Sequence, residues 1–207
     1  MALVTLDIVL LLPNDLRQQA VQCSKGLNLQ MSAQKSPSHF CLGKPFPGRN
    51  SGFCEPHVSL FMLCVDESET PAVVDTVRRT AVQITALNAE GQEYRYNPHG
   101  APELYFKKSK EWSALQQAIV TNVEPLRRGR LREVDPAGDR LADLIAKNPL
   151  NPHVTLAWPE SSSFRVDLSG LPPANTFNGT LTEIAVSGMS PFGTCTKQYD
   201  TFWLEST

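Results

Sequence analysis

Hydrophobic positions along the chain follow two periods, which indicates that strands and helices are both present. Residues 3–12 are apolar and rich in β-branched side chains, so they predict a strand, and a helix follows through about residue 26. Residues 57–65 repeat this order, with an apolar strand and then a helix from Thr70 to about Leu87. The chain therefore opens with two strand–helix units.

Residues 30–55 are polar and rich in turn formers, which predicts a long loop between these units. Further elements follow: extended segments over 94–107, helices over 109–123 and 136–147, a strand over 154–158, and two strands within 177–204 separated by a turn at 188–193. Strands and helices interleave, but no repeated right-handed βαβ pattern is evident. We therefore predict the α+β class, with mixed or antiparallel sheets.

Composition and charge exclude several classes of protein. With 19 Lys+Arg, 21 Asp+Glu and a net charge of −2, no overall positive field attracts nucleic acid or an anionic membrane, so any anion must be recognised locally. The apolar run at 3–12 is too short to span a bilayer and has no cationic start. Five cysteines, an odd number without a C-x-x-C pair, favour reduced thiols. We expect a cytoplasmic protein without a membrane or zinc site.

One short repeat stands out when the chain is compared with itself. Residues 56–60 read PHVSL and residues 152–156 read PHVTL, so the only difference replaces one hydroxyl side chain with another. Each copy lies in its own half of the chain. We therefore predict a single bilobal domain over 1–207 with pseudo-two-fold symmetry.

The repeat carries side chains suited to phosphodiester chemistry. Residues i and i+2 of a strand face the same side, about 6.6 Å apart, so His57 projects with Ser59 and His153 with Thr155. If the two strands lie side by side, two imidazoles and two hydroxyls converge on one cleft. One imidazole can accept a proton and the other donate one near neutral pH, while the hydroxyls donate to phosphoryl oxygens. This chemistry needs no metal and no cofactor.

These residues resemble the defining signature of the two-histidine phosphoesterases, which include bacterial 2',5'-RNA ligase-like proteins and RNA 2',3'-cyclic phosphodiesterases. The resemblance implies two lobes, each an antiparallel sheet with outer helices, and a central cleft that carries both H-x-[ST] strands. It implies that His153 activates water, that His57 protonates the leaving ribose oxygen, and that Ser59 and Thr155 hold the phosphate. Many bacterial relatives have a basic residue where this chain has Trp158, which weakens a tRNA-specific assignment.

The leading hypothesis is a monomeric, metal-independent phosphodiesterase that opens 2',3'-cyclic phosphates of RNA 3' ends or nucleotides to 2'-phosphates. One alternative is a hydrolase or ligase acting on 2',5'-linked or cyclic signalling oligonucleotides. The other is an RNA-end or nucleotide-binding protein with incidental turnover. The chain contains no Walker loop, G-x-G-x-x-G, H-E-x-x-H or G-x-S-x-G, so triphosphate, dinucleotide, zinc-protease and nucleophile-elbow chemistries have no support.

Other residues have more ordinary interpretations. The arginine cluster at 127–132 and the lysines at 107–110 are able to contact phosphates, but a solvated surface is the preferred interpretation. Tyr105 and Trp158 are expected to pack in the core rather than stack on a base, and His39 and His99 are expected at the surface. A hydroxyl nucleophile is disfavoured because the sequence shows no carboxylate to orient it.

Overall fold

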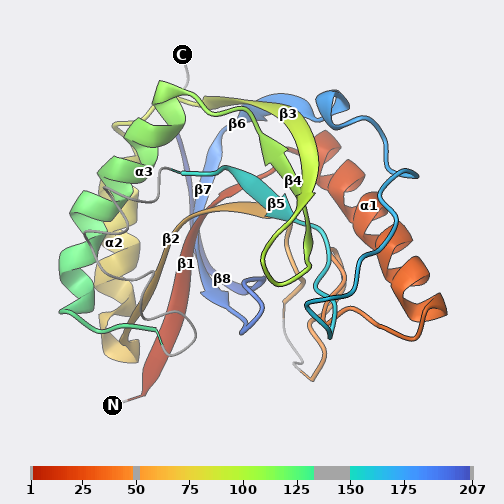
Figure 1. Cartoon of the computed structure of the whole chain (residues 1–207). Coiled ribbons are helices and arrows are strands. Elements are labelled where there is room, and N and C mark those ends of the chain that lie inside the picture. The colour runs from red at the N-terminus through yellow and green to blue at the C-terminus, as the bar shows by residue number, and fades with distance from the viewer. Residues whose placement is uncertain (1, 49–51, 133–149, 206–207) are drawn as a thin grey trace.

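Two four-stranded antiparallel sheets form the centre of the molecule (Figure 1). Their strands are β1 (Leu3–Leu11), β2 (His57–Asp66), β3 (Leu87–Tyr96), β4 (Pro102–Phe106), β5 (His153–Thr155), β6 (Asn178–Leu181), β7 (Glu183–Met189) and β8 (Cys195–Trp203). The strand order is β2-β1-β7-β8 in the first sheet and β5-β4-β3-β6 in the second. The computed structural model describes residues 2–48, 52–132 and 150–205, so the helix predicted over 136–147 lies outside the described residues.

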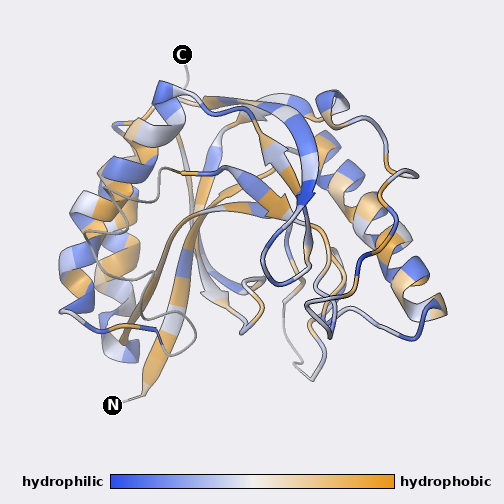
Figure 2. Ribbon diagram, viewed as in Figure 1, coloured by the Kyte–Doolittle hydropathy of each residue, from blue (hydrophilic) through white to orange (hydrophobic). Residues whose placement is uncertain are grey.

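Within the described residues, three α-helices cover the outer faces of the sheets: α1 (Asn14–Ala33), α2 (Thr70–Ala81) and α3 (Lys110–Val123). Helices α2 and α3 pack on the first sheet, while α1 lies beside the second sheet (Figure 1). Each helix turns its apolar stripe inward and its polar side outward (Figure 2). Burial of these stripes against the sheets supplies the main stabilising free energy of each lobe. The expected α+β fold with two antiparallel sheets is confirmed.

Helix α1 is longer than predicted. It continues to Ala33 rather than ending near Gly26. Leu27 and Met31, both fully buried, extend the apolar stripe of its first turns, and the space around the Cα of Gly26 is open. Tertiary packing of this stripe therefore outweighs the low helix propensity of one glycine, and the loop before β2 is correspondingly shorter.

Three other boundaries differ from the predictions. Helix α2 ends at Ala81, and the segment from Leu87 forms β3, where buried and exposed positions alternate as in a strand with one face on the core. Strand β5 ends at Thr155 rather than near residue 158. The C-terminal region holds three strands rather than two, because β6 precedes β7 and β8.

Both motif strands lie at an edge of their sheets. In the first sheet β2 pairs with β1, which sets Ser59 opposite Val9. In the second sheet β5 pairs with β4, which sets Thr155 opposite Glu103 and His153 opposite Tyr105. The two edges face each other, since β2 and β5 are in contact. No helix in the described part of the chain is long and apolar enough to cross a membrane.

Candidate active site

The two histidines are held in the same way. His57 Nδ1 lies 2.6 Å from the carbonyl oxygen of Glu55, and His153 Nδ1 lies 2.6 Å from that of Asn151. In each case the carbonyl belongs to the residue two positions upstream. A carbonyl oxygen only accepts, so each Nδ1 carries the proton and donates it. Each Nε2 is therefore left with the lone pair, or with the transferable proton, that acid–base catalysis requires.

A buried carboxyl group lies beside the first motif. Asp7, in the neighbouring strand β1, is fully buried. The hydroxyl of Ser59 lies 2.6 Å from Asp7 Oδ2, and His57 Nε2 lies 3.8 Å from the same oxygen. Asp7 thus contacts both functional side chains of this copy.

The second motif has a corresponding acid, Glu103 in strand β4. The Thr155 hydroxyl donates to Glu103 Oε1 at 3.3 Å, and His153 Nε2 lies 3.6 Å from that oxygen. Asn97 Nδ2 donates to the same oxygen at 2.7 Å, and the Tyr105 hydroxyl donates to Oε2 at 2.5 Å. Only 3% of Glu103 is exposed, and its carboxyl group accepts three hydrogen bonds. These hydrogen bonds satisfy the buried oxygens and fix their position.

The pseudo-symmetry of the site therefore extends beyond the repeated pentapeptide. Each lobe contributes an imidazole, a hydroxyl and a carboxyl group on the neighbouring strand. Sequence reasoning missed Asp7 and Glu103, because neither belongs to the repeat. A signal was nevertheless present: Asp7 interrupts an otherwise apolar strand, and a charged residue in such a place needs a partner.

Burial shifts the pKa values of both titratable groups at the first motif. Burial raises the pKa of Asp7 to about 8, so its carboxyl group is largely protonated at neutral pH. A protonated carboxyl group can donate to the Ser59 oxygen, which frees the single hydroxyl proton of Ser59 for another acceptor. Burial also lowers the pKa of His57, and the positive charge of a protonated His153 lowers it further. The free site thus favours a neutral imidazole at His57.

Replacing Asp7 with asparagine is expected to stabilise the fold at neutral pH. The pKa of Asp7 is about 8 in the folded state, against 3.8 for an unperturbed group, so the folded state binds more protons within that window. Stability of the wild type therefore falls as pH rises from about 4 to 8, by up to about 1.4 kcal/mol per pH unit. Asp7→Asn removes this dependence. Denaturant unfolding in the presence of a chelator at pH 5, 6, 7 and 8 measures the difference, and parallel curves for both proteins would contradict it.

Three arginines of the cluster at 127–132 form ion pairs with acidic side chains. Arg127 pairs with Glu124, Arg128 with Glu69, and Arg130 with Asp66 and Glu69. Arg127 is only 2% exposed, so the expectation of a solvated segment is wrong for this residue. Its guanidinium instead forms an ion pair with Glu124. All three arginines pair with carboxylates of the protein, so their charges are already neutralised without a phosphate.

Aromatic side chains contact each of the other histidines and His153. Tyr105 is in the site, with its ring centroid 5.3 Å from that of His153. Trp158 is half-buried at the edge of the core and stacks on His99 at 5.3 Å. His39 stacks on Phe192, with centroids 3.9 Å apart. The two remaining histidines are therefore packed against aromatic rings and are separate from His57 and His153.

Comparison with known proteins identifies the fold. The chain matches no protein-family profile, and no curated protein sequence matches it. It is similar to a solved phosphoesterase, with a TM-score of 0.56 and 15% identity over 98% of this chain and 99% of the other.

The chain is also similar in structure to E. coli LigT. Its apo structure superposes with a TM-score of 0.57 and 15% identity, covering 99% of both chains. Its complex with 3'-AMP gives a TM-score of 0.56 and 12% identity over 97% of this chain and 98% of that one. These similarities confirm the fold that the sequence led us to expect.

Proposed function

We propose that the protein is a metal-independent phosphodiesterase that opens 2',3'-cyclic phosphates of RNA 3' ends or nucleotides to 2'-phosphates. The observation that carries the proposal is the pair of His-x-hydroxyl motifs on facing strands, each with the same imidazole tautomer and each beside a buried carboxyl group. Packing alone does not require a matching histidine and hydroxyl in both lobes.

The two imidazoles divide the proton transfers. By resemblance, His153 accepts a proton from water as the water oxygen attacks phosphorus, and His57 donates its Nε2 proton to O3' of the ribose as the P–O3' bond breaks. The product keeps the phosphate on O2'. The reaction leaves His57 neutral and His153 protonated, so exchange with solvent restores the starting state.

The hydroxyls and the substrate charge complete the site. Ser59 and Thr155 donate to the non-bridging oxygens, where negative charge increases in the transition state. His57 is largely neutral in the free site, but a bound phosphate places a negative charge beside it and raises its pKa. Substrate binding therefore supplies the protonated acid that the leaving oxygen needs.

A substrate panel tests this function. We expect turnover of 2',3'-cyclic nucleotides and of RNA with a cyclic 3' end, and phosphorus NMR should show a 2'-phosphate. Hydrolysis or ligation confined to 2',5'-linked or cyclic oligonucleotides would favour the alternative substrate class. The same histidines and hydroxyls would then act on those substrates. Tight nucleotide binding without any product would contradict an enzymatic role.

A further inference from the structure

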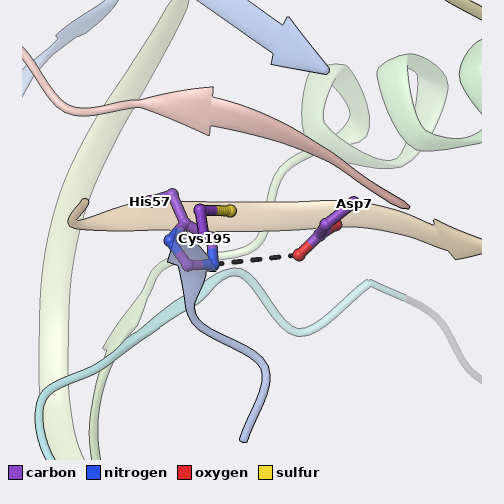
Figure 3. Close-up of side chains that lie close together, drawn as sticks. All are labelled: Asp7, His57 and Cys195. Atoms are coloured by element: carbon purple, nitrogen blue, oxygen red, sulfur yellow. Dashed lines mark ion pairs between the residues drawn. The ribbon is translucent and has the colours of Figure 1, made fainter. Parts of the chain in front are cut away.

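We propose that Asp7, His57 and Cys195 form a binding site for Zn²⁺, and that the bound ion inhibits the enzyme. The three side chains come from strands β1, β2 and β8 and converge on one point (Figure 3). One donor atom from each lies within 4.8 Å of the other two, and all three residues are buried. Inhibition rests on the proposed function, whereas metal binding does not.

The backbone brings Cys195 to the first motif. Glu55 and Cys195 form an isolated antiparallel bridge, in which the Glu55 N–H donates to the Cys195 carbonyl oxygen at 3.4 Å. Glu55 also holds the imidazole of His57 through its own carbonyl oxygen. The thiol and the imidazole are thus fixed by the same short segment, opposite the carboxyl group of Asp7.

The donor set and its spacing suit zinc. Thiolate, imidazole and carboxylate are its usual ligands, at about 2.0–2.3 Å, which separates the donors of a tetrahedral site by about 3.3–3.8 Å. His57 Nε2 and Asp7 Oδ2 are already 3.8 Å apart. The donor atoms, which lie within 4.8 Å of one another, therefore need to approach each other by about 1 Å. Mg²⁺, which prefers six oxygen ligands, does not fit this set.

Two further observations indicate that a ligand binds at this place. His57 donates Nδ1–H to a backbone carbonyl, the outer contact that orients metal-binding histidines and leaves Nε2 for the metal. Asp7 Oδ1 is buried and has no hydrogen-bond partner in the described part of the chain. A buried oxygen without a partner is costly, and a cation that binds the carboxylate through Oδ1 as well as Oδ2 removes that cost.

Inhibition follows from the identity of the ligands. Zn²⁺ binds the Nε2 lone pair of His57, so this nitrogen cannot carry the proton that the leaving oxygen requires. The Cys195 thiol and the Asp7 carboxyl group release their protons to solvent as the metal binds. Three protein ligands leave one position for water or a phosphoryl oxygen, so we expect the zinc-bound protein to bind phosphate without turnover.

The test uses Co²⁺ as a spectroscopic probe and Zn²⁺ as an inhibitor. With the full chain reduced and freed of metal by a chelator that is then removed, Co²⁺ should give a near-ultraviolet thiolate-to-cobalt charge-transfer band. Cys195→Ser should abolish this band, weaken Zn²⁺ binding in calorimetry at least about tenfold, and keep the metal-free activity. Cys23→Ser, a buried cysteine on helix α1, is the matched control and should retain both signals.

The outcomes separate the two proposals. A cobalt band that depends on Cys195, in a protein without activity on any substrate, would support the metal site and overturn the proposed function. A band or a Zn²⁺ affinity that survives Cys195→Ser would overturn the metal site and leave the phosphodiesterase intact. Zn²⁺ inhibition that is unchanged in Cys195→Ser would likewise exclude this set of ligands.

Discussion

Replacing either His57 or His153 with alanine is expected to lower the turnover of a 2',3'-cyclic nucleotide by about 10²–10⁴-fold. Each variant removes one of the two proton transfers and leaves the other group in place. The fold should be unaffected, because both imidazoles lie on edge strands, and the side chains of His57 and His153 are 10% and 33% exposed. His99→Ala, at an exposed histidine outside the site, is the control and should keep wild-type turnover.

The leaving group distinguishes the two roles. A p-nitrophenyl phosphodiester departs as a stable anion and needs no general acid, although it still needs an activated water. On such a substrate His57→Ala should regain most of the wild-type rate, whereas His153→Ala should remain slow. The reverse pattern would exchange the acid and the base. Near-wild-type turnover of the cyclic substrate in either variant would refute the acid–base assignment.

The second large effect is expected at the hydroxyls. Ser59→Ala and Thr155→Ala should each lower turnover by about 10–1,000-fold, because each loses a donor to the charge that builds on phosphate in the transition state. The two motifs use Ser and Thr at the same position, so Ser59→Thr and Thr155→Ser should stay close to wild type. Thr180→Ala, at an exposed threonine of β6, is the control.

Steady-state kinetics together with melting curves checks this prediction. Ser59 is the hydroxyl partner of the buried Asp7, so Ser59→Ala also removes a hydrogen bond inside the protein. A loss of activity that only follows a loss of folded protein would contradict a role in phosphate binding. A lowered rate constant in fully folded Thr155→Ala, with the Thr155→Ser variant active, is the pattern that the site predicts.

The sequence indicates the candidate histidines and hydroxyls because they are repeated locally. Strand parity is enough to put His57 beside Ser59 and His153 beside Thr155, and the repeat itself indicates two related lobes. The positions of Asp7, Glu103 and Cys195 depend instead on pairing between strands far apart in the chain. Cys195 is joined to the segment before the first motif by the bridge to Glu55. No local sequence pattern predicts that Cys195 lies beside Glu55.

Secondary-structure boundaries were predicted less well for a similar reason. Helix α1 passes Gly26 because Leu27 and Met31 meet a sheet that is formed by residues much later in the chain. The segment from Leu87 forms β3 because it pairs with β4 and β6 and buries alternate side chains. Local propensity describes neither partner, and tertiary packing decides the outcome.

The most direct test of the two-histidine mechanism is the hydrolysis of the four nucleoside 2',3'-cyclic monophosphates in excess chelator. The wild type is compared with a double variant carrying His57→Ala and His153→Ala, and phosphorus NMR assigns the product. The two-histidine mechanism predicts chelator-resistant turnover to 2'-phosphates in the wild type and none in the folded double variant. Turnover that the chelator abolishes, or that survives in the double variant, would contradict it.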